Sequence, residues 1–127
     1  MEDLTVDGAM TDPKGDRGLA PHAQADADLY LHVVERRPDG IVVRGAKAHQ
    51  TGFINSHEVI VMPTISMGED DKDYAVCFSC STDAEGIFMI VGRQSCDTRK
   101  MEGAPMDTGN PEFGGTEALV IFDNVFI

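Results

Sequence analysis

Apolar and polar positions along the chain form short β-type runs separated by turn residues. Val, Ile, Phe and Tyr are concentrated at residues 29–35, 41–47, 58–63, 74–80, 87–91 and 117–127. These residue types favour strands, and no stretch shows the period of an amphipathic helix. Between the first two runs, residues 37–40 place a proline and a glycine where a tight turn needs them, which predicts a hairpin over 29–47. Residues 67–73 and 101–115 are expected to be loops, and the whole pattern predicts an all-β fold, either an antiparallel β-barrel or a sandwich.

Composition and charge narrow the class of protein. The 127 residues suffice for one domain, and 10 Lys and Arg against 22 Asp and Glu give a net charge of −12. Such a charge repels nucleic acid and anionic membranes, so neither is an expected partner. Three cysteines cannot all pair within one chain and no secretory leader is visible, which predicts a cytoplasmic setting. Because the chain ends inside an apolar run, residues 1–127 are expected to be one domain cut from a longer enzyme.

The most distinctive polar stretch covers residues 8–17. Pro13 fixes one backbone angle and Gly15 frees another, while Lys14 and Arg17 place two cations on the same loop. Such a loop can turn its amides and cations toward an anion such as a phosphate or diphosphate. An ordinary charged surface turn is the alternative that these residues leave open.

The cysteines and histidines do not predict a metal site. Cys77 and Cys80 form a CxxC pair, but residues three apart in a strand point to opposite faces. Cys96 alone cannot complete a set of four thiolates, and the four histidines lack metal-ligand spacing. We therefore expect small core cysteines in this chain and no metal ligand.

Glu117 stands at the head of the last apolar run. In a continuous strand it shares a face with Leu119, Ile121 and Val125. A carboxylate at the start of an apolar strand face lies either at the mouth of a barrel or in a functional site. In such a site, removal of the carboxylate from water would suit general acid–base catalysis. An exposed first strand residue is the plainer alternative.

Two motifs carry a resemblance to a known family. Residues 9–16 (Ala-Met-Thr-Asp-Pro-Lys-Gly-Asp) resemble the Thr-Glu-Pro-x-x-Gly-Ser loop in the middle β domain of acyl-CoA dehydrogenases. Residues 45–51 (Gly-Ala-Lys-Ala-His-Gln-Thr) resemble the same family's Gly-x-Lys-x-Trp-Ile-Thr. Within this superfamily, the chain bears a closer resemblance to the 4-hydroxybutyryl-CoA dehydratases, which are also vinylacetyl-CoA isomerases. The segments that carry this closer resemblance are 7–21, 43–52, 55–58, 92–102 and 117–127.

The resemblance implies a fold, a reaction and cofactors. The chain would be a central FAD-binding β-barrel between two helical domains of a homotetramer. The enzyme would act on an acyl-CoA substrate, converting 4-hydroxybutyryl-CoA to crotonyl-CoA by a radical mechanism with FAD and a 4Fe–4S cluster. The cluster ligands would lie on the helical domains, outside this chain. The chain alone is expected to be inactive.

The resemblance also implies site residues. Glu117 and Thr51 would be catalytic, with Thr51 near the flavin N5. The cofactor-binding residues would be Met10, Thr11, Asp12, Pro13, Lys14, Gly15, Asp16, Arg17, His49 and Thr51. Two alternatives remain: a flavin-dependent 4-hydroxyphenylacetate 3-monooxygenase domain, and a non-catalytic binding module. Many of those monooxygenases carry a substrate-binding His near the first loop, where this chain has Gly8.

Overall fold

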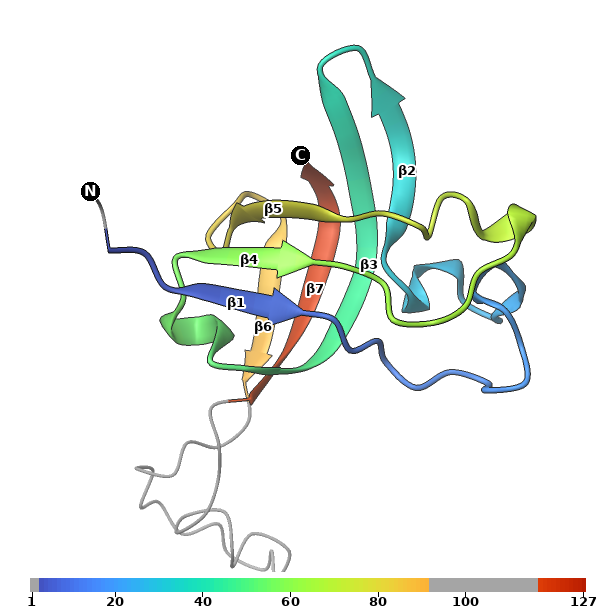
Figure 1. Cartoon of the computed structure of the whole chain (residues 1–127), viewed down its shortest axis with the longest axis horizontal. Coiled ribbons are helices and arrows are strands. Elements are labelled where there is room, and N and C mark those ends of the chain that lie inside the picture. The colour runs from blue at the N-terminus through green and yellow to red at the C-terminus, as the bar shows by residue number, and fades with distance from the viewer. Residues whose placement is uncertain (1–2, 92–116) are drawn as a thin grey trace, which may run out of the picture.

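The computed structural model describes residues 3–91 and 117–127, so the predicted loop at 101–115 and Cys96 lie outside the described residues. Within this part of the chain the regular elements are strands and 3₁₀ turns of three residues each (Figure 1). No helix here is long and apolar enough to cross a membrane. The strands are β1 (Val6–Ala9), β2 (His32–Arg37), β3 (Gly40–Thr51), β4 (Glu58–Val61), β5 (Phe78–Ser81), β6 (Ile87–Val91) and β7 (Glu117–Phe126). The 3₁₀ turns are η1 (Pro21–Ala23), η2 (Ala27–Leu29), η3 (Phe53–Asn55) and η4 (Glu69–Asp71).

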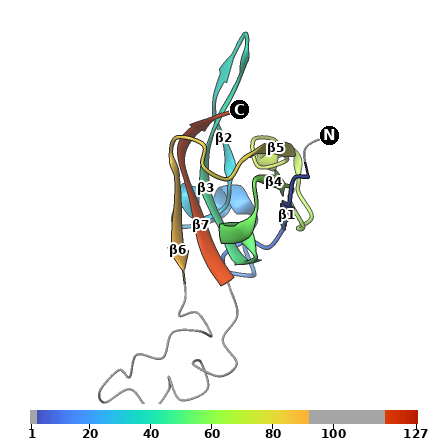
Figure 2. The ribbon, with the colours of Figure 1, turned by 90° about the vertical axis from the view of Figure 1, so that its left-hand side faces the viewer.

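The strands form two separate sheets. One has the order β1-β4-β5 and the other the order β2-β3-β7-β6. Figure 2 shows the two sheets edge-on, with β6, β7 and β3 on one side and β1, β4 and β5 on the other. The described residues are mostly β, as predicted, but the predicted closed antiparallel barrel is not confirmed: the sheets remain separate, and β1 pairs with β4 in parallel. The fold is a two-sheet sandwich.

The core lies between the two sheets. Val59 and Val61 of β4 face Val43 of β3 and Val120 and Phe122 of β7, and all five are fully buried. Each such side chain contributes about 1.5–3 kcal/mol of transfer free energy when it leaves water. This shared apolar layer holds the sheets together although they exchange no ladder of hydrogen bonds.

The alternation of β7 changes phase near its end. Glu117, Leu119 and Ile121 lie on the outer face, and the residues between them are buried. Asn124 has a left-handed φ of 55°, which shifts the alternation, so that Val125 is fully buried in the core. The predicted common face is therefore correct for Glu117, Leu119 and Ile121 and wrong for Val125.

Several strand limits differ from those predicted. β2 begins at His32 rather than at residue 29, because Asp26 caps the turn η2 by accepting a hydrogen bond from Asp28 N. β5 begins only at Phe78, since Tyr74 instead stacks on the His32 ring and donates its hydroxyl proton to Ala27 O. Tertiary contacts of single side chains thus shorten runs that look uniformly β-like.

The two described cysteines differ in burial. Cys80 lies in β5 and packs against the core, as predicted. Cys77 precedes β5 and is exposed, so the prediction that it is a core residue is wrong. The shortened strand is the reason, because Cys77 falls in the irregular segment before it.

Replacement of Gly45 by alanine should destabilise the fold. Gly45 has a φ of +134°, and a Cβ there would lie 2.5 Å from Leu31 Cα and 2.6 Å from Tyr30 O. Both obstacles are backbone, so we expect a loss of about 3 kcal/mol in the free energy of unfolding, measured by urea denaturation. Gly8→Ala is the matched control, because a Cβ at Gly8 meets nothing within 4 Å. Equal stability of the two variants would show that the fold does not require glycine at position 45.

Candidate functional site

The loop that follows β1 lies against β3. Ala48 N donates to Thr11 O at 2.9 Å, and Gln50 Nε2 donates to the same oxygen at 3.3 Å. The two segments predicted to form one site, residues 10–17 and 45–51, therefore do meet. They meet at the first residues of the loop rather than along its whole length.

A buried ion pair fixes this contact. Lys47 Nζ lies 2.6 Å from Asp12 Oδ1, and the two side chains are 3% and 9% exposed. The same ammonium donates to Met10 O at 3.3 Å and to Met62 O at 3.0 Å, so its three protons have three acceptors. Lys47 thus joins the loop after β1, the strand β3 and the end of β4.

The sequence contained a signal for Lys47 that the sequence analysis did not use. Within the β3 run, Lys47 lies in the same alternation phase as the core residue Val43. A lysine at an inward-facing strand position needs a buried acceptor, because a buried ammonium without one is costly. The pattern could therefore have predicted a carboxylate partner, although not which one.

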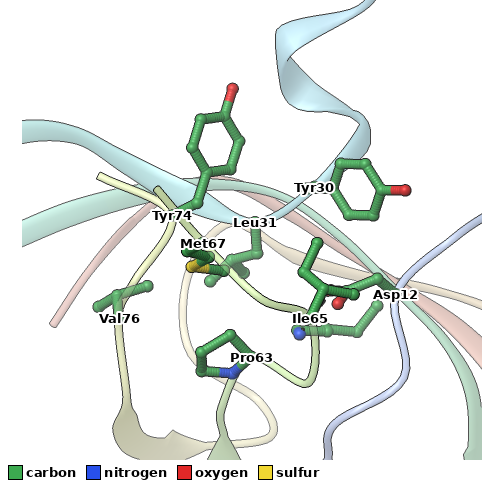
Figure 3. Close-up of a pocket in the computed structure, with 9 residues that line it drawn as sticks. Asp12, Tyr30, Leu31, Pro63, Ile65, Met67, Tyr74 and Val76 are labelled. Atoms are coloured by element: carbon green, nitrogen blue, oxygen red, sulfur yellow. Dashed lines mark hydrogen bonds and ion pairs between the residues drawn. The ribbon is translucent and has the colours of Figure 1, made fainter. Parts of the chain in front are cut away.

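A small pocket adjoins the ion pair (Figure 3). Asp12 from the loop and Lys47 from β3 border it, and Leu31 and Ile65 supply apolar walls. Its volume of about 10 Å³ is near the minimum for a single water. The apolar surroundings keep bulk water away from Asp12 and Lys47, which strengthens their attraction.

The far end of the loop is held by a different side chain. Asp16 N donates to Gln24 Oε1 at 2.9 Å, and Gln24 Nε2 donates back to Asp16 O at 2.9 Å. Gly15 lies so close to this amide that a Cβ would come within 2.3 Å of Gln24 Oε1. The main chain of Asp16 is therefore bound to Gln24, and the Asp16 carboxylate accepts a hydrogen bond from Gly18 N at 2.8 Å.

Gln24 is in turn supported by the turn η1. His22 Nδ1 lies 2.7 Å from Asp71 Oδ1, and His22 N donates to the same oxygen at 3.1 Å. Gly68 N donates to Asp71 Oδ2 at 2.9 Å. These hydrogen bonds, that from Gly68 N first and that from the His22 ring second, lower the pKa of Asp71. The nearly buried Asp71 side chain thereby ties η1 to the loop before Tyr74.

Two hollows flank the loop, and Pro13 lines both. The first, of about 430 Å³, is mainly apolar and lies over the outer face of the larger sheet. Its walls include Ala46, Phe88, Leu119 and Ile121. The second, of about 470 Å³, is more polar, and its walls include Thr11, Lys14, Arg17 and Tyr30. The loop is therefore the ridge between an apolar hollow and a cationic one.

At the end of β3 three polar side chains gather. The pairing of β3 with β7 shifts between Lys47 and Gln50, and within this irregularity His49 adopts a left-handed φ of 57°. His49 Nδ1 lies 3.3 Å from Glu117 Oε2, and Thr51 Oγ1 donates to Glu117 Oε1 at 3.4 Å. Strained residues of this kind concentrate at functional sites. Three predicted site residues are thus brought together.

The surroundings of Glu117 differ from those expected. Its side chain is 54% exposed and that of His49 is 65% exposed. The expectation that an apolar face withdraws the carboxylate from water is therefore not met by the described residues. The residues that would be needed to cover Glu117 do not come from this part of the chain.

The described cysteines are poor metal ligands. Burial, with a smaller effect of the Glu58 charge, raises the pKa of Cys80 to about 11, so its thiol stays protonated at neutral pH. Cys77 is exposed. Among residues 3–91 and 117–127, no three His, Cys, Asp or Glu side chains form a group that could hold a metal ion.

The fold recurs in larger proteins. It is found in glutaryl-coenzyme A dehydrogenase with a TM-score of 0.56 at 12% identity, over 95% of this chain and 25% of that one. The chain thus shares its fold with about a quarter of that dehydrogenase. The match to a family profile is more specific: the chain belongs to the family described as 4-hydroxyphenylacetate 3-hydroxylase N terminal, which matches residues 1–127.

Particular relatives refine this assignment. The chain is 76% identical to a 4-hydroxybutyryl-CoA dehydratase/vinylacetyl-CoA-Δ-isomerase of Clostridium aminobutyricum, over 98% of this chain and 26% of that protein. The structure of an oxygen-tolerant archaeal 4-hydroxybutyryl-CoA dehydratase from N. maritimus matches with a TM-score of 0.81 at 56% identity, over 98% and 25% of the two chains. The oxygenase component of 4-hydroxyphenylacetate 3-monooxygenase complexed with FAD matches with a TM-score of 0.73 at 28% identity, over the same shares. The chain spans about a quarter of the length of these relatives.

Removal of the Lys47 charge should loosen the loop. Lys47→Met leaves the Asp12 carboxylate buried without its partner, and we expect it to cost about 3–5 kcal/mol in the free energy of unfolding. Urea denaturation measures this loss. Lys72→Met is the matched control, because Lys72 is exposed.

A double variant separates the lost ion pair from lost packing. Adding Asp12→Leu to Lys47→Met removes the unpaired carboxylate, and should restore part of the stability. A Lys47→Met variant as stable as Lys72→Met would show that the pair does not hold the loop.

Proposed function

We propose that this chain forms the flavin-facing β domain of an enzyme that dehydrates 4-hydroxybutyryl-CoA to crotonyl-CoA and isomerises vinylacetyl-CoA. The observation that carries the proposal is the identity of 76% to a dehydratase/isomerase over nearly the whole chain. The pair of hollows beside the first loop supports the flavin part of the proposal independently.

The residues around the loop fit FAD. A flavin dinucleotide has a flat, largely apolar ring system and an anionic diphosphate. The apolar hollow, with Ala46 and Leu119 in its wall, suits the ring system, and the cationic hollow, with Lys14 and Arg17, suits the diphosphate. Within the described residues neither Lys14 nor Arg17 forms an ion pair, so both charges are available to a ligand. When bound, FAD supplies electron-transfer chemistry that side chains lack.

Not every predicted contact is equally suited to hold the cofactor. Asp12 is engaged with Lys47 and Asp16 with Gln24, so these two residues shape the loop. Lys14, between Asp12 and Asp16, and Arg17, directly after Asp16, are exposed cations. We assign the direct diphosphate contacts to Lys14 and Arg17, and the positioning of the loop to Asp12 and Gly15.

Glu117 is the residue we assign to proton transfer. His49 and Thr51 each approach one oxygen of its carboxylate and thereby orient it. The carboxylate lies at the start of β7, on the sheet face that also lines the apolar hollow. A carboxylate so held can take a proton from a substrate carbon and return it at another position, as dehydration and double-bond migration both need. The rest of the polypeptide would exclude water from this exposed end.

The 4Fe–4S cluster does not fit the described residues. Cys80 is a buried thiol of raised pKa, and Cys77 is exposed and stands alone. If the enzyme carries the cluster, we infer that its ligands belong to the helical domains outside this chain. No step of the proposal made here for this chain's residues depends on the cluster.

A hydroxylase function is the second candidate. The FAD-complexed oxygenase of 4-hydroxyphenylacetate 3-monooxygenase shares the fold but only 28% identity, against 76% for the dehydratase. Where many such oxygenases are expected to carry a substrate-binding His, Gly8 leaves open space in β1. Both observations favour the dehydratase.

Neutralising the loop cations should weaken FAD binding. In the full-length polypeptide, Lys14→Gln combined with Arg17→Gln should raise the Kd for FAD by ~100-fold, since each lost charge-assisted hydrogen bond contributes about 1.5–3 kcal/mol. Titration of flavin fluorescence measures the effect, with Lys72→Gln as the control for removal of an exposed positive charge outside the loop. An unchanged Kd would exclude this loop as the diphosphate site.

Loss of the Glu117 carboxylate should slow the reaction. In the full-length polypeptide, Glu117→Gln should lower turnover of 4-hydroxybutyryl-CoA by ~100-fold or more, because a positioned acid or base contributes 10²–10⁴-fold. Crotonyl-CoA formation is the measurement, and Glu85→Gln, another exposed position, is the control. Undiminished turnover in a variant with full flavin content would remove Glu117 from the mechanism.

A further inference from the structure

Gln24 forms an unusual contact with the first loop. Its side-chain amide both accepts a hydrogen bond from Asp16 N and donates one to Asp16 O, each at 2.9 Å. A neighbouring β-strand would bond to the main chain of Asp16 in the same way. Nε2 also donates to Leu19 O at 3.2 Å. The partners allow only one orientation of the amide, because Asp16 N needs an acceptor and the two carbonyl groups need donors.

The packing around this amide leaves little freedom. A Cβ on Gly15 would lie 2.3 Å from Gln24 Oε1 and 2.5 Å from Leu29 Cδ2. The loop main chain therefore lies flat against the Gln24 side chain and against η2. A side chain at this position would require the ends of the Gln24 and Leu29 side chains to shift, which would disturb the contact of Gln24 with the loop.

Gln24 itself is attached to the body of the domain. It directly follows η1, in which Pro21 is fully buried and His22 makes two contacts to Asp71 Oδ1. Asp71 is 2% exposed and accepts a further hydrogen bond from Gly68 N. The contacts of Asp71 thus hold the turn from which the Gln24 side chain extends.

Lys14 and Arg17 flank the segment that Gln24 holds. Residues 15 and 16 lie between them, and both cations line the polar hollow of about 470 Å³. Lys47 fixes the loop at Asp12, before Lys14, and Gln24 fixes it at Asp16, before Arg17. Gly18 N donates to Asp16 Oδ1 at 2.8 Å and Leu19 N donates to Asp16 O at 3.1 Å, so the turn that carries Arg17 is fixed relative to Asp16. Gln24 in turn fixes Asp16 relative to η1, and thereby sets where Arg17 lies with respect to Lys14.

We propose that Gln24 is a positioning residue for diphosphate recognition, holding the main chain at Asp16 so that Lys14 and Arg17 face the anion together. This inference rests on the proposed function, in which the loop receives the diphosphate of FAD. Gln24 touches no part of the ligand in this proposal. It reduces the ordering that the loop would otherwise undergo when it binds.

The test compares FAD with riboflavin, which has the same ring system and no phosphate. Binding of each to the flavin-free full-length polypeptide is measured for the wild type, Gln24→Ala and Gln24→Glu. Gln24→Glu keeps the size and an acceptor for Asp16 N but loses both donated hydrogen bonds. Ala25→Ser, at an exposed neighbouring position, is the matched control.

We expect both Gln24 variants to raise the Kd for FAD by ~10-fold, from the loss of two or three hydrogen bonds, and to leave the Kd for riboflavin within ~2-fold. A parallel loss for both ligands, or no loss for either, would overturn the inference. If the wild type binds FAD no more tightly than riboflavin, the failure lies instead with the proposed diphosphate site.

Discussion

The ion pair between Lys47 and Asp12 is the interaction on which the site depends. A polar loop that leaves a short strand has no ladder of hydrogen bonds to fix it, and here the loop is held by a charge pair that is almost completely buried. Burying two charges is costly, and the cost is offset only because the ammonium also reaches Met10 O and Met62 O. Such a pair specifies where the loop lies more than it adds stability.

The loop is anchored at two points and free between them. Lys47 holds Asp12 from the sheet side, and Gln24 holds Asp16 from the side of η1. The segment between these points carries Lys14, and Arg17 follows the second point. A protein of net charge −12 can therefore present a local cationic surface, because the backbone around the two cations is fixed by other residues.

The outer face of the larger sheet links this loop to the polar end of β3. Pro13 borders the apolar hollow, Leu119 and Ile121 form part of its wall, and Glu117 continues the same face of β7. The irregular pairing near His49 turns that side chain toward Glu117. One sheet face thus carries an apolar surface with a cationic loop and a carboxylate beside it. This arrangement suits the proposed flavin reaction.

The sequence determined most of the strands and the hairpin, because alternation and turn residues are local properties. The resemblance to a known family, and no local pattern, implied that the two motifs meet. It could not decide how the sheets close: Val59 and Val61 look the same in a barrel and in a sandwich. It also could not show that Val125 turns inward, since that depends on the left-handed Asn124. Gln24 looks like an ordinary polar residue in the sequence, and the inward position of Lys47 indicates a buried partner without saying which one. Only the tertiary structure identifies these partners, because it brings Asp12 to Lys47 and the main chain of Asp16 to Gln24.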